Sequence, residues 1–231
     1  MLTSFVEAAR AAFDGDLRAI VLYGSGAEGS LRPGSDVNVL VLLAAFDAAK
    51  AEQVRESLRA GHAAARLVAM FVTERELQPA MEAFAVKFSD IRRRRFVLFG
   101  SDPFANAVIP RESAIVRLRQ TLLNLTLRMR EIYISRGAQD EQLVRAIGEM
   151  AGPLRACAAT LRELQGKAVP SAREGFAQAA AELLGEAGAG ELTANITEAR
   201  QSGALPGGKP AQTFRTLIDI AQRLGSEAQS L

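Results

Sequence analysis

Two apolar segments, Ala19 to Tyr23 and Val37 to Leu43, are separated by a short glycine-rich connection, and this connection limits the fold more than any other feature. Both segments have the length and composition of buried strands. A helix that crosses back over a sheet takes a dozen or more residues, and Pro33-Gly34 would interrupt one here. The spacing therefore predicts two successive strands joined by a turn.

The connection begins with Gly24-Ser-Gly26-Ala-Glu-Gly29, which is also a literal G-x-G-x-x-G after a strand. In a dinucleotide-binding fold the third glycine lies in a helix that packs along the sheet, and the connection leaves no room for that helix. Asp47 lies near the end of the next strand, where a ribose-binding acid would be sought, so the dinucleotide-binding alternative stays open. A P-loop is excluded because no Gly-Lys-Ser/Thr follows the glycines.

The rest of the N-terminal half alternates helical and strand-like patterns. The further elements it predicts are helices over residues 2–13 and 47–60, the latter closed by Gly61, and strands over 66–72 and 96–99. Thr73 and Glu76 have the spacing of a capping box, which predicts a helix start. We expect that helix to break near Pro79.

After Pro110 no strand-like segment appears, and Leu-, Ala- and Arg-rich runs predict only helices. The expected helices cover residues 112–135 and 140–164, the latter kinked at Gly152-Pro153, one beginning at Ser171, and shorter ones over 191–201 and 212–224. The sequence thus predicts an α+β protein with two domains: a small mixed-sheet α/β domain over residues 1–106, followed by an all-α helical bundle over 107–231.

Composition removes several functional classes. Cys157 and His62 are the only residues of their types, which excludes an intrachain disulfide and Cys- or His-rich metal sites. No apolar run reaches the about 18 residues of a membrane helix, and the N-terminus lacks the order of a secretion signal. We therefore expect a cytoplasmic enzyme or regulator with no membrane partner.

Charge is evenly distributed, with a net charge of +2, so the chain lacks a broad electrostatic footprint for nucleic acid. The local exception is the run Arg92-Arg93-Arg94-Arg95. It is interpreted either as a solvated strand entrance or as a phosphate contact, because arginine recognises phosphate well.

The segment Val21-Leu-Tyr-Gly24-Ser25, followed by Ser35 and by Asp36-Val37-Asn38, resembles the signature of the nucleotidyltransferase superfamily, which has the DNA polymerase beta-like fold. That signature is a hydrophobic residue, Gly-Ser, a spacer of about this length and Asp-x-Asp. The resemblance covers residues 17 to about 104. It implies that Gly24, Ser25 and Ser35 bind a nucleoside triphosphate and that Asp36 and Asn38 occupy the catalytic, metal-binding positions.

The resemblance also implies a difficulty for catalysis. In the family, two carboxylates on alternate strand positions and a third from a later strand hold two Mg²⁺ ions. Here Asn38 offers one neutral oxygen, and no residue from 66 to 72 is acidic, Ala69 being the best match to the third position. Only one of three expected carboxylates is present, although Glu74 or Glu76 could reach the site. Asp36 could also be merely a turn residue.

Three hypotheses follow. The chain binds nucleotide through a compromised two-metal site and acts in regulation or with weak activity, with Mg²⁺ bound weakly or not at all. Alternatively, it is an active nucleotidyltransferase that transfers a nucleoside monophosphate from a nucleoside triphosphate to a small-molecule or protein hydroxyl. In the third hypothesis it is a non-catalytic scaffold that presents an arginine-rich helix to a partner.

Overall fold

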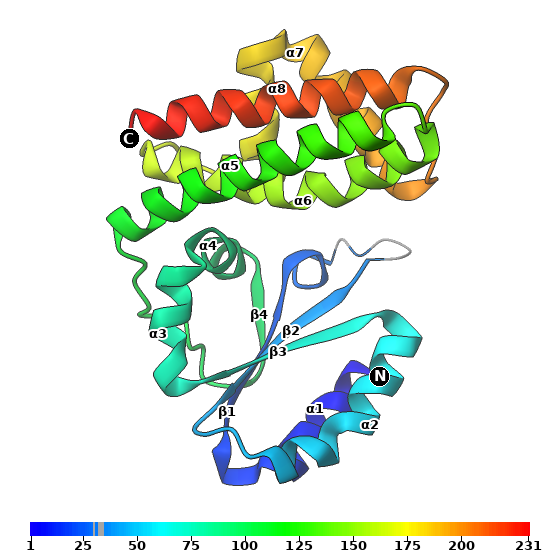
Figure 1. The fold of residues 1–231 in the computed structure, drawn as a ribbon. Helices are drawn as coiled ribbons and strands as arrows, with labels where there is room; N and C mark the ends of the chain where they lie inside the picture. The colour runs from blue at the N-terminus through cyan, green and yellow to red at the C-terminus, as the bar shows by residue number, and fades with distance from the viewer. Residues whose placement is uncertain (30, 32–34) are drawn as a thin grey trace. The chain divides into compact units, whose positions relative to one another are not determined.

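The computed structural model describes residues 1–29, 31 and 35–231, so part of the expected glycine-rich connection, at 30 and 32–34, lies outside the described residues. The chain forms two compact units, and each is made of two segments. The α/β unit comprises Met1–Ala83 and Ile91–Ile109, and the helical unit comprises Phe84–Asp90 and Pro110–Leu231. The chain is therefore of the α+β class, as the sequence predicts (Figure 1).

The α/β unit contains a mixed sheet of four strands in the order β3-β2-β1-β4. Its strands are β1 (Leu17–Tyr23), β2 (Val37–Leu43), β3 (Leu67–Thr73) and β4 (Arg95–Gly100). Strand β1 is antiparallel to both β2 and β4, whereas β2 and β3 are parallel. All four predicted strands are present.

The pairing of β1 with β2 excludes the dinucleotide-binding alternative. In that fold the two strands around the glycine motif are parallel and are connected by a crossover helix. Here they are antiparallel neighbours, with Tyr23 opposite Asn38. Asp47 has a local role instead: its carboxylate accepts hydrogen bonds from the amides of Ala49 and Lys50 at 2.8 and 3.2 Å, and so caps helix α2 (Ala48–Ala65).

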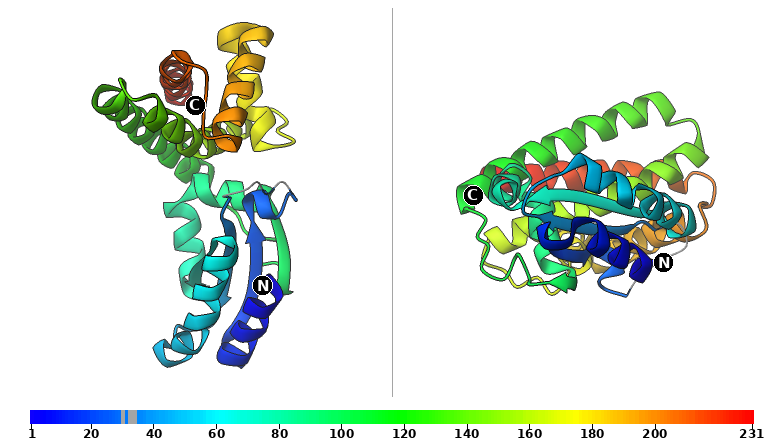
Figure 2. Two further views of the ribbon diagram at one scale, coloured as in Figure 1. Left: turned by 90° about the vertical axis from the view of Figure 1, so that its right-hand side faces the viewer. Right: turned by 90° about the horizontal axis from the view of Figure 1, so that it is seen from below.

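Helices α1 (Leu2–Phe13) and α2 cover one face of this sheet (Figures 1 and 2). Side chains alternate along a strand, and the odd-numbered residues of β2 contribute to the core on this face. That core consists of Phe5, Ala9, Ala12, Phe13, Leu17, Ile20, Leu22, Val37, Val39, Val41, Leu43, Val54 and Leu67. The face of β2 that carries Asn38 is therefore the opposite one.

Helix α2 does not end at Gly61, as the sequence suggested, but continues to Ala65. Gly61 is buried, and a Cβ atom there would lie 2.7 Å from Cδ2 of Leu67. The glycine thus permits close packing of the helix on β3. The helix ends at Arg66, whose φ of 53° reverses the chain into the strand.

The carboxylate half of the capping box at Thr73 is confirmed: the Glu76 carboxylate accepts from the Thr73 amide at 3.0 Å, and it also accepts from the Thr73 hydroxyl at 2.7 Å. The expected break at Pro79 is wrong, because helix α3 (Glu74–Ala83) passes through it. The amide that proline lacks would have donated to the Arg75 carbonyl, and because Arg75 is exposed, solvent can take the place of that donor. A further helix, α4 (Ala85–Arg93), was not predicted.

The helical unit is a bundle of α5 (Arg111–Arg136), α6 (Asp140–Leu164), α7 (Ala172–Gln201) and α8 (Lys209–Gln229), as Figure 1 shows. The Ser171 hydroxyl accepts from the Glu174 amide at 3.1 Å, which confirms the predicted helix start. Gly185, at φ 73° and ψ 168°, interrupts α7. Cys157 is fully buried in the core of this unit.

No helix within residues 1–29, 31 and 35–231 is both long and apolar enough to cross a bilayer.

Candidate functional site

One edge of the sheet brings the predicted site residues together. Because β1 is antiparallel to β2 and β4, the end of β1 meets the beginnings of both: Tyr23 pairs with Asn38 on one side and with Arg95 on the other. Strand β3 is parallel to β2 and also begins here, with Leu67 opposite Val37. The Gly24–Ser25 turn, Ser35, Asp36 and Asn38 therefore all belong to this edge, which we call the β1 edge.

The Gly24–Ser25 turn is held by its backbone. Gly24 begins a short 3-10 helix, η2 (Gly24–Gly26), at a φ of 72°, a conformation that favours glycine. Its amide donates to the Arg94 carbonyl at 2.9 Å, and its carbonyl accepts from the Ala27 amide at 3.0 Å. Burial raises the pKa of the adjacent Tyr23 phenol. The turn is thus fixed between the ends of three strands.

Asp36 lies directly before β2, two positions from Asn38. Its Oδ1 accepts from Nε of Arg66 at 2.7 Å in an ion pair. The Asn38 amide donates from Nδ2 to the Asp36 carbonyl at 3.3 Å. The two predicted metal positions therefore engage an arginine and the backbone.

The assignment of Ala69 to the third carboxylate position is wrong. In the parallel register Asn38 lies opposite Val68, whereas Ala69 lies opposite Val39 and packs with it in the core under α1 and α2. Paired residues of neighbouring strands share a face, so the position beside Asn38 is Val68. The side chain there is still non-acidic.

Glu74 and Glu76 do not complete the site either. They follow the end of β3, and Glu74 pairs with Arg18, at the start of β1, at 3.1 Å. This is the opposite edge of the sheet. Hydrogen bonds from the hydroxyl and amide of Thr73 lower the pKa of Glu76 and hold its carboxylate in the capping box.

The residues at the β1 edge do not fit a pair of magnesium ions. Two ions that share a site need several oxygen ligands, with bridging carboxylates among them. Within the described ranges, no three or more His, Cys, Asp or Glu side chains gather in a way that could hold a metal ion. Asp36 as a ligand of a single ion, with Asn38 beside it, stays a prediction.

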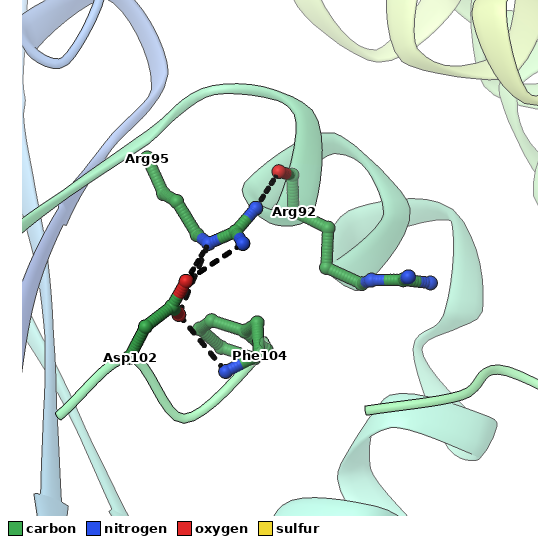
Figure 3. A network of polar contacts seen from close by, with 4 residues as sticks. All are labelled: Arg92, Arg95, Asp102 and Phe104. Atoms are coloured by element: carbon green, nitrogen blue, oxygen red, sulfur yellow. Dashed lines mark hydrogen bonds and ion pairs between the residues drawn. The ribbon is translucent and has the colours of Figure 1, made fainter. Parts of the chain in front are cut away.

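The arginines of the run at 92–95 have different contacts. Arg95 binds Asp102 through Nε and Nη2, at 3.0 and 2.7 Å from Oδ2, and its Nη1 donates to the Arg92 carbonyl. Asp102 also accepts from the Phe104 amide at 3.0 Å. Figure 3 shows this network, with the Arg92 side chain pointing away from it. Arg95 thus secures the loop after β4.

Arg94 lies beside the glycine turn. Its carbonyl accepts from Gly24, and its Nη1 lies 3.3 Å from Oε2 of Glu28. Together with Arg66, it places a second guanidinium group at the β1 edge. Sequence reasoning missed Arg66 as a site residue, although its position as the first residue of the third predicted strand was a usable signal.

Comparison with known proteins supports the fold. No protein-family model matches the chain, and no curated protein matches it by sequence. Among solved structures, the chain is similar to the spectinomycin adenyltransferase AAD(9) from Enterococcus faecialis, solved with ATP and spectinomycin. The identity is 14%, the TM-score is 0.58, and the match covers 96% of this chain and 98% of that one. The chain therefore has a nucleotidyltransferase-like fold.

Proposed function

We propose that the chain binds a nucleoside triphosphate, ATP or GTP, at the β1 edge and acts in regulation or with weak activity, because its metal site is depleted. The observation that supports the proposal most directly is the combination at this edge. A glycine turn suited to phosphate is held beside a single carboxylate, with Asn38 and Val68 in the positions where further carboxylates would be needed.

The physical basis is anion binding by a fixed turn. Successive backbone amides in a tight glycine turn form a concave site for phosphate, and they need no reorganisation when the ligand arrives. The bond from Gly24 to the Arg94 carbonyl fixes that turn, and two guanidinium groups, each paired with a carboxylate, lie at the same edge. The ATP in the similar adenyltransferase structure supports the same ligand class here.

A charge placed in the turn tests this proposal. We expect Ser25→Asp to weaken ATP binding by about tenfold or more, because a carboxylate repels the phosphates at close range. Titration calorimetry with ATP and with GTP measures the effect. Ser4→Asp, on the exposed surface of α1 in the same unit, is the matched control and should bind as the unmodified protein does. Absence of binding for both nucleotides at millimolar concentration would refute the proposal and favour the scaffold hypothesis.

The likeness to an adenyltransferase over nearly the whole of both chains favours active transfer as a second candidate. In that case the acceptor is a small-molecule or protein hydroxyl. Incubation with α-labelled ATP, with and without spectinomycin, would reveal a labelled product. Label transfer that Asp36→Ala abolishes would establish catalysis.

A further inference from the structure

The ion pair between Asp36 and Arg66 gives the β1 edge a cation of its own. We propose that Arg66 stands in place of a metal ion as the counter-charge of Asp36, so that the site takes the phosphates of a nucleotide without a divalent cation. The ligand would be the metal-free nucleoside triphosphate, a part of the inference that rests on the proposed function. The displacement of metal by Arg66 can be tested without any nucleotide.

The backbone holds Arg66 in position on both sides. Its amide donates to the His62 carbonyl at 2.7 Å, which ends α2, and its carbonyl accepts from the Val37 amide at 3.2 Å, which joins it to the start of β2. The φ of 53° is unfavourable for a residue with a side chain. The backbone bonds to His62 and Val37 thus fix the position of the Arg66 Cα atom, and the side chain reaches Asp36 from there.

The charges favour the guanidinium group over a metal ion. Asp36 is the one carboxylate of the three expected positions, and Asn38 turns its Nδ2 toward the Asp36 carbonyl at 3.3 Å. A metal ion at Asp36 would have to displace Arg66 from a contact of 2.7 Å. Coordination by the neighbouring residues would compensate little for the loss of that ion pair, because Asn38 is neutral and Val68 is apolar.

Arg66 is also suited to binding phosphate. Its contact with Asp36 uses Nε, and a guanidinium group carries four further N–H donors in a planar fork that matches phosphate oxygens. The side chain is 59% exposed, so a ligand can reach it. Arg66 precedes β3, and Gly24 follows β1, two strands away, which places the two backbones about 10 Å apart. An arginine side chain and a triphosphate can span this distance.

Metal binding alone tests the first half of the inference. We expect the unmodified protein to bind Mn²⁺ weakly in the absence of nucleotide, as measured by electron paramagnetic resonance. Arg66→Gln, which keeps the side-chain length but removes the charge, should bind Mn²⁺ at least about tenfold more tightly, and Asp36→Asn in the same background should abolish the gain. Arg66→Lys should behave as the unmodified protein.

Nucleotide binding tests the second half. We expect the ATP affinity of the unmodified protein to change less than about twofold between EDTA and excess Mg²⁺, and Arg66→Gln to lower the affinity in EDTA about tenfold through loss of a charge-assisted bond. Asp36→Asn should retain or raise the ATP affinity, because the variant removes a negative charge that repels the phosphates. If Asp36 instead held a metal ion for the nucleotide, the same variant would lower the affinity. Arg55→Gln is the matched control, since Arg55 forms an exposed pair with Glu52 on the same helix.

The possible failures are distinguishable. ATP binding that requires Mg²⁺ and is lost in Asp36→Asn would overturn the inference but keep nucleotide binding. No ATP binding under any condition would refute the proposed function, and the Mn²⁺ measurements would still decide the role of Arg66. If Arg66→Gln fails to fold, the Asp36→Asn variant decides by the direction of its effect.

Discussion

Gly61 shows how one residue can be essential for the geometry of the candidate site. It lies inside α2, where glycine is ordinarily unfavourable by about 1 kcal/mol relative to alanine, yet the helix approaches β3 so closely that a Cβ atom would meet Leu67. The next turn of the same helix ends at Arg66. Close packing at Gly61 therefore helps to fix the position of Arg66 relative to the sheet at the β1 edge.

Replacement of this glycine gives a stability test. We expect Gly61→Ala to lower the free energy of unfolding by about 1–3 kcal/mol, because the added methyl group overpacks the contact with Leu67. Gly225→Ala is the control: Gly225 lies in α8 with no atom within 4 Å of the built Cβ. That variant should be stabilised by up to about 1 kcal/mol. Urea denaturation measures both, and equal stabilisation of the two variants would contradict the packing role.

At this scale the sequence identified residue types but not their partners. Gly24, Ser25, Asp36 and Asn38 were found because their spacing along the chain is fixed. The contact of Asp36 with Arg66 depends on the register of β2 with β3, which no local pattern specifies. The same ignorance of register led to Ala69, one position away from Val68 and therefore on the opposite face.

Strand β4 depends on the loop that follows it. Asp102 accepts hydrogen bonds from Nε and Nη2 of Arg95 and from the Phe104 amide, and the hydrogen bonding from Arg95 lowers the pKa of Asp102. A carboxyl group whose pKa is lower in the folded state stabilises the fold above its unfolded pKa of about 3.9. That stabilisation is lost as the pH falls through the lower, folded value.

This sign predicts how an Asp102 variant responds to acid. We expect Asp102→Asn to lower the free energy of unfolding by about 1 kcal/mol at pH 7. The difference from the unmodified protein should shrink as the pH falls from 5 to 3. Urea denaturation across this range measures it. Glu52→Gln, which removes an exposed pair with Arg55, should show almost no difference. A deficit in Asp102→Asn that grows in acid would contradict the prediction.

Among the elements, strong periodic patterns were predicted well and exceptions to local rules were not. The four strands and the long helices α5 and α6 follow their apolar spacing. Gly61 and Pro79 were interpreted as helix ends because each is locally unfavourable in a helix. Tertiary packing at Gly61, and solvent at the Arg75 carbonyl, remove the need for an ending. Helix α4 was missed because it is short and its polar residues, together with the arginine run, leave too few apolar residues for a clear helical periodicity.

At the scale of the whole molecule, the chain enters the helical unit twice. Residues 84–90 belong to this unit, and the chain then returns to the α/β unit for β4 before α5 begins. Val86 is 6% exposed and packs in the core cluster that also contains Leu118, Leu122 and Met150. The first turns of α4 are therefore part of the core of the bundle.

Truncation of that side chain should affect one unit. We expect Val86→Ala to lower the free energy of unfolding by about 1–2 kcal/mol through lost burial and a cavity. Hydrogen exchange should accelerate in α5 and α6 more than in β1 and β2. The control is Phe84→Ala two residues earlier, since Phe84 is 61% exposed and its loss should cost less than about 0.5 kcal/mol. Faster exchange confined to the sheet would contradict this division.

The double entry has a consequence for biosynthesis. Synthesis runs from the N-terminus, and domains generally fold as their segments emerge from the ribosome. Residues 84–90 emerge before β4 and well before the helices that bury Val86. A nascent chain that has reached residue 109 contains every segment of the α/β unit, but its α4 still lacks its partners. The side chain that α4 contributes to the core of the bundle is thus without its packing partners until the later helices are made.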